Sequence, residues 1–207
     1  MSLAIPAASV STDTIAEQKK RLRGEVRAAR KALDEGAREQ AAMRVTRRFL
    51  EALPVMRPGA MSSVVAVYWP HGSELDTRPL LQALHAVGHT CVLPVVIEPA
   101  APLEFRRWTP ETELQPAALG IPVPVGTEAA VPEVIAAPLL AFDEAGFRLG
   151  QGGGFYDRTI AALRQAGDLV VAGVAFEMQR VEKVPRDGYD LPVDWMVTDA
   201  ATRVIVT

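Results

Sequence analysis

The apolar residues of the first quarter of the chain recur every three or four positions, which is the spacing of an amphipathic helix. Thr14 is followed three residues later by Glu17, a pattern typical of a capping box at a helix N-terminus. A second helix is expected over residues 35–53, and Pro54 is expected to end it because proline lacks the amide that a helix interior needs. The apolar stripe of the first helix consists of Ile15, Leu22, Val26, Ala29 and Leu33.

Beyond residue 62 the pattern changes to short apolar runs separated by helical segments. One helix is predicted from Asp76, as its N-cap, to Val87, with Pro79 in its first turn, and another over residues 155–166. Because strands alternate with helices, we expect an α/β fold in one domain, residues 15–207, with a mainly parallel sheet covered on both faces. Strands are predicted at residues 63–68, 90–96, 134–142, 169–175, 194–198 and 203–206, with a short strand at 103–108 and a loop with fragments of structure over 109–133.

Composition mainly excludes classes of protein. The 207 residues are 49% hydrophobic and 23% charged, which is ordinary for a globular protein and argues against wholesale disorder. A single cysteine, Cys91, excludes an intramolecular disulfide framework and a multi-cysteine zinc site, and its apolar neighbours predict a buried thiol. No apolar run approaches the roughly 18 residues of a membrane span, and the start lacks a basic signal-peptide region, so a cytoplasmic protein is expected.

Charge is distributed unevenly along the chain. Residues 1–50 hold 11 Lys and Arg against 6 Asp and Glu, a net charge of +5, whereas the whole chain carries −3. Such a basic segment suits nucleic acid, a membrane surface or a phosphate-bearing ligand. At about 100° per residue, Lys19, Arg23, Arg27 and Arg30 lie beside the apolar stripe rather than opposite it, so they are placed to reach into a cleft.

A glycine-rich loop is the most informative segment. Gly150 and Gly152, Gly153 and Gly154 lie between a predicted strand and a predicted helix. Glycines let the backbone approach an anion, and the free amides and dipole of a helix N-terminus favour phosphate. The loop matches neither the Walker loop nor the dinucleotide fingerprint, and a tight turn alone needs fewer glycines, so we favour phosphate binding. The candidate carboxylates for Mg²⁺ are Asp143, Asp157 and Asp190, although each also suits a helix terminus or a turn.

Residues 148–158 read Arg-Leu-Gly-Gln-Gly-Gly-Gly-Phe-Tyr-Asp-Arg, and with this motif the sequence resembles the 5-formyltetrahydrofolate cyclo-ligase family. The resemblance extends over residues 17–200, and its further motifs occur in the family's order. They are the basic helix at 19–23, Tyr68-Trp-Pro, Glu74-Leu-Asp-Thr, Gly120-Ile-Pro-Val-Pro, Gly173-Val-Ala-Phe, and the segment from Gln179 through Asp190 to Asp199. Residues 1–14 have no counterpart in it and are expected to form a disordered extension.

The resemblance implies a three-layer α/β sandwich of the ribose-5-phosphate isomerase and CoA-transferase type. It also implies ATP- and Mg²⁺-dependent closure of 5-formyltetrahydrofolate to 5,10-methenyltetrahydrofolate, with release of ADP and phosphate. In the family's reaction the formyl oxygen attacks the γ-phosphate, N10 then attacks the imidate phosphate, and phosphate leaves. The expected partners are therefore folate and ATP, without nucleic acid or membrane, and a monomer is expected.

Carried onto this sequence, the resemblance implies a role for each matched residue. Arg148 and Tyr156 would be catalytic, Asp157 and Asp190 would hold Mg²⁺, and Phe155 replaces a tyrosine common in the family. Leu119 stands where some members have a tryptophan against the substrate. Substrate would contact Trp69, Glu74, Phe155 and Tyr156. The residues that would bind ATP are Lys19, Lys20, Arg23, Arg148, Gly150, Gln151, Gly152, Gly153, Gly154, Phe155 and Tyr156.

Two alternatives use the same fold for other purposes. One is a non-catalytic module whose basic helix binds RNA, and the other is a different small-molecule enzyme such as a sugar-phosphate isomerase. The intact glycine motif and both carboxylates argue against the first. Dependence on ATP separates the second from the cyclo-ligase.

Overall fold

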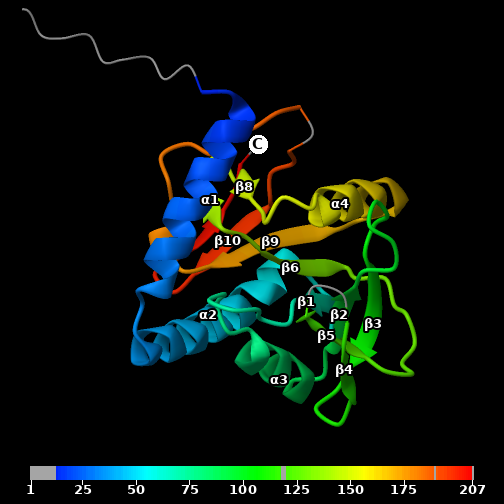
Figure 1. Ribbon diagram of the computed structural model, residues 1–207. Helices are drawn as coiled ribbons and strands as arrows, with labels where there is room; N and C mark the ends of the chain where they lie inside the picture. Colours follow the sequence, from blue (N-terminus) through cyan, green and yellow to red (C-terminus); the bar gives the residue numbers. More distant parts are fainter. Residues whose placement is uncertain (1–12, 118–119, 189, 207) are drawn as a thin grey trace, which may run out of the picture.

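The computed structural model describes residues 13–117, 120–188 and 190–206. Its centre is a seven-stranded sheet in the order β11-β10-β9-β6-β1-β2-β3 (Figure 1). The five inner strands run parallel, and β3 and β11 pair antiparallel at the two edges. The strands are β1 (Val64–Val67), β2 (Thr90–Val95), β3 (Glu104–Trp108), β6 (Val134–Pro138), β9 (Val170–Ala175), β10 (Trp195–Thr198) and β11 (Thr202–Val204).

Helices cover both faces of this sheet, as Figure 1 shows, because alternate strand residues point to opposite faces. Val65 and Val67 of β1 pack with α2 (Glu35–Met56) and α3 (Arg78–Ala86), whereas Ala66 between them packs on the side of α4 (Phe155–Ala166). The three-layer α/β fold with a mainly parallel sheet, predicted from the sequence, is confirmed. None of the helices in the described ranges is long and apolar enough to cross a membrane.

The first helix, α1 (Ile15–Lys31), packs against a small sheet rather than against the central one. Its apolar residues Leu22 and Val26 contact a cluster that includes Ala141 and Leu149, from β7 (Ala141–Phe142) and β8 (Arg148–Leu149). The predicted capping box is present, since Thr14 and Glu17 bond each other's backbone amides. Residues 1–12 of the expected disordered extension lie outside the described residues, and Thr14 belongs to the cap of α1.

Two predictions of helix boundaries are wrong. Pro54 does not end α2, which continues to Met56 because Leu53 and Met56 are both buried in the core. The N-cap of α3 is Thr77, not Asp76, although Asp76 Oδ1 accepts a hydrogen bond from the amide of Arg78 at 3.0 Å.

The single strand predicted over residues 134–142 is two strands. β6 ends at Pro138, and β7 then pairs with β8 in the separate hairpin. The buried amide of Gln179 makes this break possible, because its Nε2 donates to the carbonyl oxygens of Leu139 and Leu140 at 2.8 and 2.9 Å. Within 109–133, predicted as a loop with fragments of structure, the chain forms the short pair β4 (Leu114–Pro116) and β5 (Pro122–Pro124).

Candidate functional site

A cavity of about 580 Å³ opens at the carboxyl ends of three neighbouring parallel strands. Tyr68 and Trp69 follow β1, Val96 follows β2, and Leu139 follows β6, and all four line it. Within the sheet, β1 has β2 as its neighbour toward one edge and β6 as its neighbour toward the other edge. The strand order therefore reverses between β1 and β6, and open α/β sheets bind ligands at such a point.

The glycine loop forms one wall of the cavity, between β8 and α4. Gly152 and Gly154 have φ angles of 108° and 67°, a left-handed backbone that residues with side chains rarely adopt. Gly154 is the N-cap of α4, and it has no side chain to accept a hydrogen bond from the helix. The backbone amides in the first turn of α4 are therefore left for another acceptor. The loop therefore presents backbone donors to the cavity at the positive end of a twelve-residue helix.

The basic side chains of α1 reach three different segments around the cavity. Lys19 Nζ lies 2.6 Å from Asp190 Oδ2 and 3.0 Å from Asp187 Oδ2. Arg23 Nε donates to the Gly150 carbonyl at 2.9 Å, and Arg30 Nε donates to Ser73 Oγ at 3.1 Å. Lys19 and Arg23 line the cavity, as predicted for cations bordering the apolar stripe.

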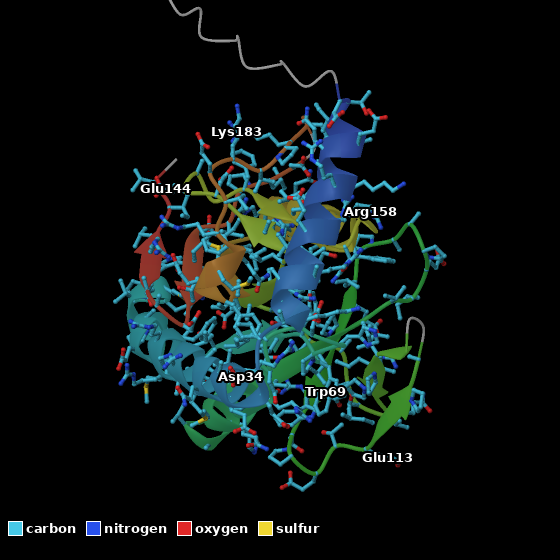
Figure 2. All side chains as sticks on the ribbon, turned by 60° about the vertical axis from the view of Figure 1, so that its left-hand side comes forward. Asp34, Trp69, Glu113, Glu144, Arg158 and Lys183 are labelled. Carbon is cyan, nitrogen blue, oxygen red and sulfur yellow. The ribbon has the colours of Figure 1, made fainter. Side chains whose placement is uncertain are left out.

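Lys20, which follows Lys19 in the sequence, is exposed and is not part of the cavity lining. Figure 2 shows α1 running down the front of the molecule. Burial opposes the charge of Lys19, but its hydrogen bonds with Asp190 and Asp187 raise its pKa above the ordinary value. Lys19 is thus a firmly charged ammonium at the cavity edge.

Arg148 is buried next to the Asp157 carboxylate, with 3% of its side chain exposed. Its guanidinium donates to Asp157 Oδ1 at 2.9 Å and to the Leu191 carbonyl at 2.8 Å. Burial lowers its pKa and the Asp157 carboxylate opposes that shift. Arg148 therefore ties Asp157, in the first turn of α4, to the loop that carries Asp190.

Asp157, Asp187 and Asp190 all line the cavity, so one region brings together three carboxylates. Within the described ranges no three His, Cys, Asp or Glu side chains form a ready metal cluster, and the carboxylates pair with Lys19 and Arg148. Oxygen donors of this kind suit Mg²⁺, which usually takes one or two carboxylates and completes its shell with water and phosphate.

Asp143, the third candidate Mg²⁺ ligand from the sequence, has a different role. It is buried and is not part of the cavity lining. Its Oδ1 accepts from the amides of Ala145 and Phe147 at 3.1 Å each, and its Oδ2 accepts from the amide of Val184 at 3.0 Å. Asp143 therefore joins the β7–β8 turn to the segment after β9, and it lies outside the cavity lining.

Trp69 and Glu74 also line the cavity. Glu74 Oε2 accepts from the His71 amide at 3.1 Å, and Oε1 accepts from Gln151 Nε2 at 3.1 Å. Phe155 and Tyr156 line the space between this turn and the glycine loop. Burial raises the pKa of Tyr156, and the Glu74 carboxylate raises it further, so its phenol is a neutral hydrogen-bond donor. Leu119 lies outside the described residues.

Sequence reasoning missed several residues that line the cavity. Tyr68 is buried and its hydroxyl donates to the Leu75 carbonyl at 3.2 Å. Asp187 shares Lys19 with Asp190, and Arg158 places its guanidinium 5.2 Å from the centre of the Phe155 ring. Arg158 ends the glycine motif and Asp187 lies three residues before Asp190, which are usable signals, whereas Val96, Leu103 and Ile121 resemble ordinary core positions and carry none.

Comparisons with known proteins give consistent results. A model described as the 5-formyltetrahydrofolate cyclo-ligase family matches residues 15–199. A protein of Escherichia coli K12 named 5-formyltetrahydrofolate cyclo-ligase is 36% identical over 180 residues, covering 84% of this chain and 96% of that protein. A Haemophilus influenzae protein of the same name is 30% identical over 184 residues, covering 86% and 95%.

Solved structures agree with these relatives. The NMR structure of Aquifex aeolicus 5,10-methenyltetrahydrofolate synthetase superposes with a TM-score of 0.76 at 32% identity, covering 90% of this chain and 92% of that one. A 5,10-methenyltetrahydrofolate synthetase from Mycoplasma pneumoniae superposes with a TM-score of 0.68, covering 87% and 98%. At 21% identity this second likeness supports the fold alone.

Proposed function

Because this chain belongs to the 5-formyltetrahydrofolate cyclo-ligase family, we propose that it uses ATP to close 5-formyltetrahydrofolate to 5,10-methenyltetrahydrofolate, releasing ADP and phosphate. The observation that carries the proposal is a cavity whose lining combines groups suited to an anion, namely the glycine loop with Lys19 and Arg23, with aromatic and apolar side chains. Its volume of about 580 Å³ lies within the usual range for ligand sites. A triphosphate and a flat heterocycle are therefore able to meet inside it.

The glycine loop and the α1 cations are suited to hold the triphosphate. Phosphoryl transfer needs in-line positioning and neutralisation of charge more than a protein nucleophile. The amides of residues 150–154 supply backbone donors, while Lys19 and Arg23 supply positive charge. Arg148 adds buried charge behind Asp157. Lys20 does not line the cavity, and its role is therefore a separate proposal: it would reach the nucleotide from the exposed side of α1.

Asp157 and Asp190 are our proposed protein ligands for Mg²⁺. Both line the cavity beside the cations that would meet phosphate, and both offer hard oxygen donors. When bound, Mg²⁺ would neutralise charge on the phosphate oxygens. Since Lys19 and Arg148 already pair with these carboxylates, the proposal requires that at least Lys19 exchanges Asp190 for phosphate when nucleotide enters.

The folate would lie against Trp69, Phe155 and Tyr156, whose rings suit a flat heterocycle. Glu74 would accept hydrogen bonds from the pterin or orient the formyl end. The neutral phenol of Tyr156 would donate to the formyl or phosphate oxygen, because its raised pKa rules out service as a base near pH 7. In this arrangement the formyl oxygen faces the γ-phosphate.

The test is to mix the protein with Mg²⁺, ATP and 5-formyltetrahydrofolate and to follow the absorbance of the methenyl product. An ATP-dependent signal is expected, and folded protein that gives none refutes the proposal. Asp157→Asn is expected to lower turnover by 100-fold or more, on the order of the loss of a key electrostatic group, with the melting temperature close to that of the wild type. Near-normal activity of Asp157→Asn removes Asp157 from the metal site.

A monomeric state and a cytoplasmic location remain predictions. Size-exclusion chromatography with light scattering tests the first, and cell fractionation tests the second. The RNA-binding alternative is tested by a gel shift, where salt-sensitive binding without nucleotide binding would favour it. The direction of the α1 cations, which contact Asp190, Gly150 and Ser73, supports the ligase instead.

A further inference from the structure

Gln151 differs from its neighbours in the glycine loop because its side chain, not its backbone, makes the contacts that the structure describes. Its Oε1 accepts a hydrogen bond from Arg27 at 2.5 Å, and its Nε2 donates to Glu74 Oε1 at 3.1 Å. Both partners are distant in sequence, one on α1 and the other in the turn after β1. Gln151 therefore connects three segments of the cavity wall.

The orientation of the Gln151 amide follows from these contacts. A guanidinium only donates, so the amide must turn its oxygen to Arg27, and its nitrogen then faces Glu74. A carboxylate only accepts, so both contacts favour the same orientation. Gln151 is thus held in one of its two amide orientations by groups on opposite sides.

Glu74 is the group whose position this arrangement affects most. Its two oxygens are held separately, Oε1 by Gln151 and Oε2 by the His71 amide at 3.1 Å. Burial raises the pKa of Tyr68 and of Tyr156, and the Glu74 carboxylate raises both further, so its charge lies near both phenols that line the cavity. A small displacement of this carboxylate changes the field at the place assigned to the pterin and formyl group.

We propose that Gln151 is a positioning residue, whose side chain fixes the Glu74 carboxylate for the folate rather than binding ATP. This inference rests on the proposed function, since it assigns Glu74 to the folate side. Among the hydrogen bonds of residues 13–117, 120–188 and 190–206, the Gln151–Glu74 bond is the side-chain link between the glycine loop and the turn at 71–74. The glycine loop, which would hold the triphosphate, thereby also fixes the position of the Glu74 carboxylate, which would contact the folate.

The kinetic test uses Gln151→Met, which keeps the length of the side chain and removes both hydrogen bonds. The KM for 5-formyltetrahydrofolate is expected to rise about three- to tenfold, as for the loss of one ordinary hydrogen bond at a solvent-exposed position, while the KM for ATP stays within about twofold. Gln40→Met, on the exposed face of α2, is the matched control and is expected to leave both values unchanged. A rise in the ATP KM alone overturns the proposal.

A double-mutant cycle then tests whether Gln151 acts through Glu74. In a Glu74→Gln background, Gln151→Met is expected to add less than about twofold to the folate KM, because the group it positions has already changed. Effects that multiply fully show that the two residues act independently and overturn the proposal. Arg27→Met, which releases the amide of Gln151, is expected to act in the same direction with a smaller change.

A measurement without substrate separates failure of this inference from failure of the proposed function. If Gln151 holds Glu74, then Gln151→Met loosens the bond from the His71 amide to Glu74, and hydrogen exchange at that amide accelerates about threefold or more. Unchanged exchange overturns the inference. Accelerated exchange in a protein without ATP-dependent turnover supports the positioning of Glu74 and refutes the ligase activity instead.

Discussion

Asp143→Ala is the substitution for which the structure makes the sharpest distinction between support of the fold and catalysis. The Asp143 side chain is buried and accepts from three backbone amides, those of Ala145, Phe147 and Val184. Removing the carboxylate leaves these donors without their acceptor. Each hydrogen bond to a charged group contributes about 1.5–3 kcal/mol, although water will satisfy some of the partly buried amides after the substitution.

We therefore expect Asp143→Ala to lower the free energy of unfolding by about 3–5 kcal/mol. For a chain of this size that corresponds to a fall in melting temperature of roughly 6–15 °C. The assay is thermal and urea unfolding followed by circular dichroism, with Asp168→Ala, at an exposed position, as the matched control. The control is expected to change stability by less than about 0.5 kcal/mol.

The activity of the folded variant completes the test. Below its melting temperature, Asp143→Ala is expected to need the same Mg²⁺ concentration for half-maximal turnover as the wild type, because Asp143 does not line the cavity. A shifted Mg²⁺ requirement with unchanged stability would refute this reasoning and return Asp143 to the metal site. A loss of less than about 1 kcal/mol would show that the three amides find other acceptors.

Three further predictions concern backbone, thiol and acid behaviour. Gly154→Ala places a side chain at a φ of 67° with its Cβ 2.7 Å from Arg158, so steady-state kinetics should show a severalfold higher ATP KM with little change in the folate KM. Burial raises the pKa of Cys91 to about 12, so a thiol reagent at pH 8 should label it only after urea unfolding, and stability should fall as the pH rises above 9. Burial opposes the charge of Glu177, but hydrogen bonds from Arg203 and Thr198 lower its pKa, so it stabilises the fold above pH 4.5 and loses this effect in acid. The stability difference between wild type and Glu177→Gln should therefore shrink as the pH falls below 4.5, and a constant difference would contradict this assignment.

The α1 helix explains why the basic first quarter of the chain is compatible with an acidic remainder. Lys19 meets Asp187 and Asp190, while Arg23 and Arg30 meet a carbonyl and a hydroxyl on other segments. Arg30 is 3% exposed, and burial lowers its pKa while the Glu74 carboxylate opposes the shift. Lys19 and Arg23 therefore line the cavity and Arg30 is buried, and all three attach α1 to other segments of the chain.

Local features of the fold were predictable from sequence because they depend on neighbours in the chain. The capping box at Thr14 and the bounds of α4 at Phe155 and Ala166 agree with the prediction, since side chains within one turn determine them. The glycine loop was also recognisable, because left-handed backbone at Gly152 and Gly154 requires glycine wherever the loop lies. The sequence by itself therefore determined most of the element types, the mainly parallel sheet covered on both faces, and the glycine loop that we propose binds phosphate.

Tertiary structure decided which of the polar residues meet. Asp143 and Asp157 are both acids near the same motif, yet one is buried among amides and the other lines the cavity with Arg148. The break after Pro138 depends on Gln179, about 40 residues further along the chain. The bonds from Gln151 to Arg27 and to Glu74 bridge 124 and 77 residues. Such contacts arise from the order of the strands and the packing of α1, which periodicity along the chain does not encode.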